Sequence, residues 1–222
     1  MSPERPRSPV VVLISGRGTN MRALIEYSRR SDSPYTVAAV LSDRGDAAGL
    51  RIAAELGVPA QALVEDPGTA RAAYDRCLAA AVSRSSPSLV ALAGFMRILS
   101  DAFVREFEGH ILNIHPSLLP QYPGLHTHRR VLAAGDAVHG ATVHYVTAEL
   151  DSGPAVIQAR IAVGPDDDES SLARRVQAQE HRMYPLAVRW HCEGRLRYVA
   201  GAAWFDGAPL HAPLQLADID AA

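Results

Sequence analysis

The chain has 222 residues, of which 48% are hydrophobic, and this suffices for one buried core in one domain or at most two small ones. Its 22 basic and 24 acidic residues give a formal net charge of −2, a near-balance that argues against a nucleic-acid partner. No apolar run in the sequence reaches the roughly 18 residues that a membrane helix requires, so we expect no membrane association.

All 22 basic residues are arginine. Without lysine the chain has no phosphate-binding P-loop lysine, no Schiff-base lysine and no lysine general base. This excludes P-loop NTPases, pyridoxal enzymes and class I aldolases. The two cysteines, Cys77 and Cys192, form neither a disulfide framework nor a metal quartet, which indicates a reducing cytoplasm.

Apolar segments of strand length alternate with helical patterns along most of the chain. Buried strands are expected at 10–14, 37–41, 89–93, 111–114, 142–146 and 155–163. Helices are expected at 21–27, 47–56, 72–80 and 171–192, the last one interrupted or kinked at Pro185. This alternation predicts an α/β fold, a mostly parallel twisted sheet with helices on both faces. Residues 1–9 are predicted to be a loose leader, 10–205 a single domain and 206–222 a weakly ordered tail.

The first expected strand runs directly into the segment 15–20, with the sequence SGRGTN, and then into a helix. Glycines permit a tight turn, and the free N–H groups of a helix start attract an anion. Because open α/β sheets bind ligands at the mouth of the first strand, the segment predicts a phosphate-binding loop. The third glycine of the dinucleotide fingerprint is absent, but Asp43 after the second strand imitates the ribose-binding acid of NAD proteins. A non-catalytic NAD-binding module that uses Gly16, Gly18 and Asp43 is therefore an alternative.

Asn113 and His115 flank Ile114 in another expected strand. In an extended chain, side chains two residues apart point to the same side, so an amide donor lies beside an imidazole. Such a pair can stabilise a developing oxyanion and move a proton. Glu149 and Asp151 lie in a glycine–proline loop between two expected strands. A carboxylate from this loop can hold the tautomer of His115 and favour its charged form if the fold brings the two together, which a separation of some 36 residues does not itself define.

Three further histidines, His126, His128 and His144, are candidate zinc ligands, but no cysteine or glutamate ligand pattern accompanies them. We therefore expect the first two on a mobile loop, His144 on a strand, and no metal. The acidic run 166–169 precedes the long helix, where the helix dipole favours negative charge. It is predicted to be a solvated cap.

Several motifs, in this order, resemble the glycinamide ribonucleotide formyltransferase family. They are SGxGTN at 15–20, AGFMRIL at 93–99, NIHPSLLP at 113–120, YPG at 122–124, VH at 143–144, LDSGP at 150–154 and QEH at 179–181. Together they cover residues 10–205. The NxHPS and DxGP elements are shared with other folate formyltransferases and mark the chemistry. The phosphate loop and the length mark the family, since we expect no room for the extra domains of transfer-RNA formyltransferases or formyltetrahydrofolate hydrolases.

The resemblance implies the Rossmann-like formyltransferase fold, with a phosphate-binding N-terminal half and a C-terminal half for folate and catalysis. It implies transfer of the formyl group of the co-substrate 10-formyltetrahydrofolate to the amine of 5′-phosphoribosylglycinamide, in purine biosynthesis and without a metal. The implied partners are thus small molecules, and the chain is expected to be a monomer or homodimer. A related formyltransferase that acts on another amine, such as an amino-sugar nucleotide, is the alternative enzyme.

The resemblance also implies roles for particular residues. Asn113, His115 and Asp151 match the catalytic residues. The ribonucleotide contacts match Gly18, Thr19, Asn20 and Glu180. The folate contacts match Arg71, Met96, Arg97, Ile98, Leu99 and Asn113. An extra guanidinium at Arg17 fits beside a phosphate, and residues 118–138 match a mobile flap over the site.

Overall fold

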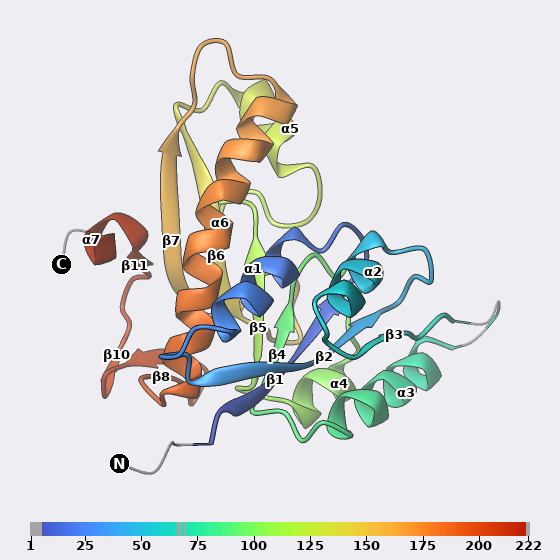
Figure 1. The fold of residues 1–222 in the computed structure, drawn as a ribbon. Helices are drawn as coiled ribbons and strands as arrows, with labels where there is room; N and C mark the ends of the chain where they lie inside the picture. Colours follow the sequence, from blue (N-terminus) through green and yellow to red (C-terminus); the bar gives the residue numbers. More distant parts are fainter. Residues whose placement is uncertain (1–5, 66–67, 69, 221–222) are drawn as a thin grey trace.

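A single eight-stranded sheet forms the centre of the fold in the computed structural model, which describes residues 6–65, 68 and 70–220 (Figure 1). The strands lie in the order β11-β7-β6-β5-β4-β1-β2-β3. Their bounds are β1 (Ser8–Ile14), β2 (Tyr35–Ser42), β3 (Ala60–Ala62), β4 (Leu89–Leu92), β5 (Ile111–His115), β6 (Val138–Tyr145), β7 (Ala155–Ala162) and β11 (Leu214–Gln215). Only β6 runs antiparallel to its neighbours β5 and β7. The mostly parallel sheet predicted from the alternation is confirmed.

Helices cover both faces of this sheet. They are α1 (Thr19–Ser28), α2 (Ala48–Glu55), α3 (Arg71–Ser83), α4 (Asp101–Glu106), α5 (Thr127–Ala134), α6 (Glu169–Cys192) and α7 (Leu216–Asp220). Strand β1 shows the two faces most clearly, because its side chains alternate between two cores. Val10, Val12 and Ile14 pack with α1 and α6, whereas Val11 and Leu13 pack with α3 and α4. All five side chains are fully buried, which explains why β1 is an uninterrupted apolar run.

Helix α6 is continuous over 24 residues, with Pro185 inside it. The predicted interruption is therefore wrong, and the alternative, a kink at Pro185, stays a prediction. Pro185 is buried, and the packing of α6 against α1 and the sheet outweighs the hydrogen bond that proline removes. The helix starts with a capping box, in which Asp168 accepts from the Ser171 N–H at 2.6 Å. The acidic run at 166–169 therefore contains the N-cap of α6. No helix in the described part of the chain has the length and apolar character needed to cross a bilayer.

The C-terminal segment has regular structure up to residue 220, in contrast to the predicted weakly ordered tail. A small antiparallel sheet consists of β8 (Leu196–Val199), β9 (Ala202–Phe205) and β10 (Ala208–Pro209). Strand β11 then pairs with β7 at the edge of the main sheet, and Leu216 is buried behind it. At the N-terminus, Ser8 and Pro9 of the predicted leader already belong to β1. The rest of that prediction at 1–5, and the end of the predicted tail at 221–222, lie outside the described residues.

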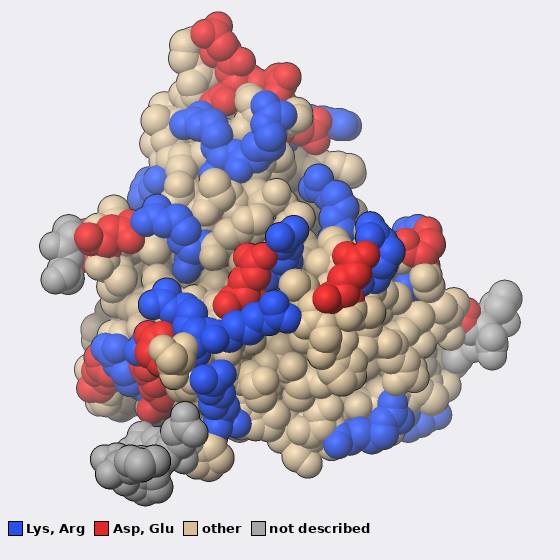
Figure 2. Space-filling model, in the orientation of Figure 1, with Lys and Arg blue, Asp and Glu red and all other residues tan. Residues whose placement is uncertain are grey.

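The chain changes direction between β1 and β4, since β2 and β3 follow on one side of β1 and β4 lies on the other. Ligands of open α/β sheets bind outside the carboxyl ends of the strands at such a point. Two hydrogen bonds join the loops there: the Ser15 N–H donates to the Gly94 carbonyl at 3.0 Å, and the Met96 N–H donates to the Ser15 hydroxyl at 2.8 Å. Acidic and basic side chains are interspersed on the face shown in Figure 2, consistent with the balanced charge.

Candidate active site

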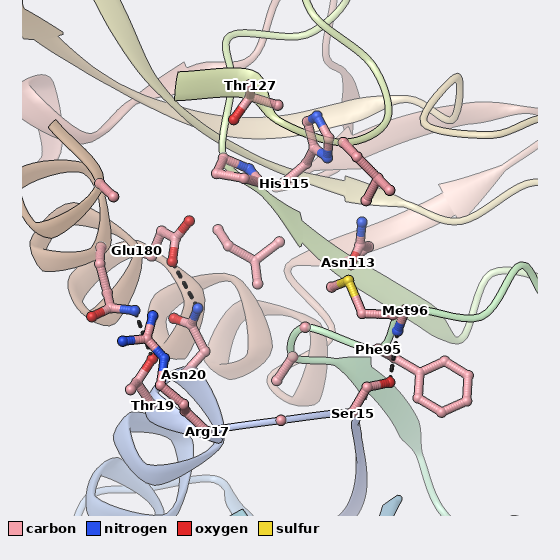
Figure 3. A pocket seen from close by; sticks show the side chains of 18 of the residues that line it. Ser15, Arg17, Thr19, Asn20, Phe95, Met96, Asn113, His115, Thr127 and Glu180 are labelled. Carbon is pink, nitrogen blue, oxygen red and sulfur yellow. Dashed lines mark hydrogen bonds between the residues drawn. The ribbon is translucent and has the colours of Figure 1, made fainter. Parts of the chain in front are cut away.

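A cavity of about 760 Å³ lies at the carboxyl ends of β1, β4 and β5 (Figure 3). Its walls come from the loop after β1, the segment after β4, the end of β5, the loop between β6 and β7, and the first half of α6. Residues 124–128, from the loop before α5 and the first turn of α5, complete the lining. Segments far apart in the sequence thus converge on one cavity of the size that small-molecule sites have.

One end of the cavity is the loop that leads into α1. Gly18 is the N-cap residue, with a left-handed φ of 72°, and neither a side-chain cap nor an acidic residue occupies the first turn. The N–H groups of this helix start and Arg17 line the cavity, an arrangement whose partial positive charge attracts anions. Gly49 of α2 holds the loop in place, because its N–H donates to the Gly16 carbonyl at 3.0 Å. The two segments also approach too closely for a side chain at Gly18, since an added Cβ would lie 2.9 Å from the Gly49 Cα.

Residues from α6 complete this end of the cavity. Gln177 donates to the Thr19 hydroxyl at 2.9 Å, and Asn20 donates to the Glu180 carboxylate at 2.8 Å (Figure 3). Asn20 and Glu180 are buried, and burial raises the pKa of the Glu180 carboxyl. The Asn20 side-chain oxygen is buried without a hydrogen-bond partner among the residues described. The pair therefore presents acceptor oxygens that suit the hydroxyl groups of a sugar. The sequence motifs did not identify Gln177 or Gly49.

We expect Glu180→Gln to increase thermal stability at neutral pH. The folded-state pKa of Glu180 is raised, so the wild type loses stability as the pH rises from the unfolded value, near 4.5, through the folded value. Glutamine avoids this penalty and can still accept from Asn20. The Tm difference between variant and wild type, measured by calorimetry from pH 4 to 8, should widen with pH and then level off. The exposed Glu106→Gln is the control, and parallel Tm curves for Glu180→Gln and wild type would contradict this expectation.

The other end of the cavity brings together Asn113, His115 and Asp151. Asn113 and His115 lie at the end of β5, and Asp151 lies in the loop between β6 and β7. The His115 Nδ1 atom is 3.5 Å from Asp151 Oδ2, and both side chains are more than nine-tenths buried. Strand β6 pairs with β5, with Thr142 opposite His115. This pairing brings Asp151 close to His115 although 36 residues separate them in the sequence. Asp151 has a left-handed φ of 51°, a conformation that aspartate tolerates better than most residues.

Two backbone groups of the segment 118–138 contact these side chains. The His115 Nε2 atom is 3.0 Å from the Tyr122 carbonyl oxygen, and the Gly124 N–H donates to Asp151 Oδ2 at 2.8 Å. A carbonyl oxygen only accepts, so Nε2 carries a proton. Both ring nitrogens of His115 therefore face oxygen acceptors, an arrangement that the doubly protonated ring satisfies.

His144 of β6 also belongs to this end of the cavity, although the sequence predicts only a polar strand residue. Its Nε2 atom is 3.1 Å from Asn113 Nδ2 and 3.8 Å from Asp151 Oδ1. Burial lowers the pKa of His144 to about 4, so the ring is neutral at physiological pH. The other two histidines considered as ligands, His126 and His128, line the cavity. Within the described ranges, no three His, Cys, Asp or Glu side chains are grouped as a metal would require.

An apolar wall follows β4. Met96 and Ile98 line the cavity with 64% and 56% of their surface exposed, and Leu125 and Leu150 face it from other loops with more than half exposed. Exposed apolar side chains gathered on one cavity suit a flat, largely apolar ligand.

Of the other predicted folate contacts, Arg97 lines the cavity, whereas Leu99 and Arg71 do not. Arg97 lines the cavity, pairs with Glu65 at 2.8 Å and covers the Tyr74 ring. Leu99 is buried behind the wall, and Arg71 donates to its carbonyl, so neither residue is part of the lining. Asp43, which the NAD-binding alternative requires, also lies outside the lining.

Comparison with known proteins defines the class of this molecule. The formyl transferase family model matches residues 8–188, so the chain belongs to the formyl transferase family. It is 49% identical to phosphoribosylglycinamide formyltransferase of Escherichia coli over 90% of this chain and 95% of that protein. It is 41% identical over 88% of its length to the trifunctional purine biosynthetic protein of Drosophila pseudoobscura, of which it covers 14%. The structure of phosphoribosylglycinamide formyltransferase from Coxiella burnetii superposes with a TM-score of 0.89 at 42% identity, covering 94% of this chain and all of that one.

These similarities confirm the family resemblance and the formyltransferase fold predicted from the motifs. They also establish the chain as a transferase, which removes the non-catalytic NAD-binding alternative.

Proposed function

We propose that this enzyme transfers the formyl group of 10-formyltetrahydrofolate to the amine of 5′-phosphoribosylglycinamide, giving formylglycinamide ribonucleotide and tetrahydrofolate in purine biosynthesis. The observation that carries the proposal is that an uncapped helix start and an Asn–His–Asp group lie at two ends of one cavity. The names of the relatives in Escherichia coli and Drosophila support the choice of substrate and pathway.

The cavity accommodates the two substrates from different sides. The phosphate binds at the start of α1, where the N–H groups of Thr19 and Asn20 and the Arg17 guanidinium supply donors. The ribose hydroxyls donate to Glu180 and to the free oxygen of Asn20. The folate ring system packs on the apolar wall formed by Met96, Ile98, Leu125 and Leu150. This arrangement directs the substrate amine toward the formyl carbon beside β5.

Asn113 and His115 stabilise the charge that develops during the attack. As the amine adds to the formyl carbon, the formyl oxygen becomes negative and the nitrogen positive. The Asn113 amide donates to that oxygen, and His115 contributes its positive charge and the Nε2–H that the Tyr122 carbonyl accepts in this structure. A preorganised donor of this kind typically contributes about 2.7–4 kcal/mol to lowering the barrier.

Asp151 supports the proton movement that completes the reaction. Its carboxylate holds His115 in place and accepts from the Gly124 N–H, which keeps it beside the reacting atoms. Once the new carbon–nitrogen bond has formed, the negative oxygen regains its double bond to carbon and the bond to the folate nitrogen breaks. One proton passes from the attacking amine to the departing folate nitrogen, with Asp151 relaying it through water.

The direct test is an assay of the purified chain with both substrates that follows formation of tetrahydrofolate. We expect turnover that saturates with 5′-phosphoribosylglycinamide and persists after dialysis against EDTA. Parallel reactions contain an amino-sugar nucleotide or the dephosphorylated ribosylglycinamide as acceptor. Turnover with the amino-sugar nucleotide but none with 5′-phosphoribosylglycinamide would show that the chain is the other kind of formyltransferase.

A further inference from the structure

The side chains of Asn113 and His144 are cross-strand neighbours in the middle of the site. The antiparallel register of β5 and β6 places the two residues directly opposite each other. Residues opposite each other in an antiparallel pair project from the same face of the sheet. The β6–β7 register shifts between Val143 and His144, and such bulges re-aim a side chain next to a site. The contact between Asn113 Nδ2 and His144 Nε2, at 3.1 Å, is thus set by the backbone pairing.

The hydrogen bonds of His144 fix its tautomer. Its Nδ1 atom lies 2.9 Å from the Tyr145 carbonyl oxygen, which only accepts, so Nδ1 carries a proton. The side chain is 2% exposed, and burial favours the neutral ring. A neutral ring with its proton on Nδ1 has only a lone pair on Nε2. His144 therefore offers Asn113 an acceptor and no donor.

This acceptor distinguishes the two orientations of the Asn113 amide. With the nitrogen toward His144, one N–H donates to Nε2 and the second N–H is left for the cavity. With the amide flipped, the oxygen of Asn113 would face the lone pair of Nε2, and two acceptors would repel each other. The surroundings of the amide thus select one orientation.

We infer that His144 is a positioning residue for formyl transfer: as a neutral acceptor it holds the Asn113 amide in the orientation that presents an N–H to the formyl oxygen. The expected effect on kcat rests on the proposed function. The expected orientation of the Asn113 amide rests only on the geometry of β5 and β6. It differs from a merely structural role, because a core histidine acts on stability while a positioning histidine acts on kcat through Asn113.

A double-mutant cycle tests the kinetic consequence. His144→Leu removes the acceptor, and we expect kcat to fall by about 10–100-fold, the usual range for a lost partner of a reacting group, with KM nearly unchanged. His144→Gln offers an amide oxygen near the position of Nε2 and should recover most of this loss. In an Asn113→Ala background, His144→Leu should lower kcat no further, because the residue through which it acts is gone.

Nuclear magnetic resonance of the ¹⁵N-labelled wild type tests the structural consequence without any substrate. The proton of His144 should be on Nδ1, and the Asn113 side-chain amide signals should shift in His144→Gln. If formyl transfer to 5′-phosphoribosylglycinamide were absent, the proposed function would fail while these spectra still tested the orientation.

Three outcomes would overturn the inference. They are a proton on Nε2 of His144, additive losses in the double variant, and a His144→Leu enzyme with lowered Tm but wild-type kcat. The spectra of the wild type test the position of the His144 proton even if His144→Leu does not fold.

Discussion

His115→Ala is expected to lower kcat by about 10²–10⁴-fold, the range typical of a lost acid–base or oxyanion group. The substitution removes the ring that lies 3.5 Å from Asp151 and faces the Tyr122 carbonyl. It leaves the anion site at the start of α1 unchanged, so KM for the ribonucleotide should change much less than kcat. Steady-state kinetics with both substrates, alongside Tm, measures the effect.

Two controls make the result for His115→Ala specific. The exposed His211→Ala removes the same side chain away from the cavity and should retain wild-type kinetics. Imidazole added to His115→Ala should restore part of the rate, because the truncation leaves a space of its shape. A variant that keeps near-normal kcat with a normal Tm would remove His115 from the mechanism.

The N-terminal half of the site was predictable from local sequence. A buried strand, two glycines and a helix start in succession define the anion loop, because each of these signals depends on neighbouring residues. The spacing of Asn113 and His115 on one strand likewise predicts two side chains on one face. The Gly49 contact was not predictable, because it depends on how α2 packs against the loop after β1.

The other half of the site depends on strand pairing that the sequence does not encode locally. Only the family resemblance predicts a role for Asp151, since a 36-residue separation alone defines no contact with His115. The sequence predicts His144 only as a strand residue, because its position opposite Asn113 exists only once β6 pairs with β5. The order of the C-terminal segment also depends on strand pairing and not on its local composition. The segment has few large apolar residues, but Leu214 pairs with the open edge of β7 and Leu216 is buried in the core.

Several groups in the cavity are poorly satisfied without a ligand. The Asn20 side-chain oxygen is buried and unpaired in the part of the structure described, the Glu180 carboxyl is buried, and Asp151 has a left-handed backbone. Each feature costs stability, and such costs concentrate where a protein binds or reacts with something. Their position in one cavity supports the assignment of both of its ends to a single site.

Gly153→Ala is expected to disrupt the Asp151 loop and to lower both stability and activity. An added Cβ at Gly153 would lie 1.9 Å from the Tyr145 carbonyl oxygen, and a backbone atom cannot move away by a change of rotamer. The same oxygen accepts from His144, and the Tyr145 N–H donates to the Pro154 carbonyl at 3.1 Å. The loop must therefore shift relative to β6, which carries Asp151 away from His115.

For Gly153→Ala we expect a loss of stability of about 1–3 kcal/mol, as for other overpacked sites, and a fall in kcat/KM of about 10²-fold from the displaced carboxylate. Thermal unfolding and steady-state kinetics measure the two effects. Gly45→Ala is the matched control, because the nearest atom to its new Cβ is Val64 Cγ2 at an ordinary 3.5 Å and its φ is not left-handed. If Gly153→Ala matched Gly45→Ala in both measurements, the close approach of this loop to β6 would not be what holds Asp151 at the site.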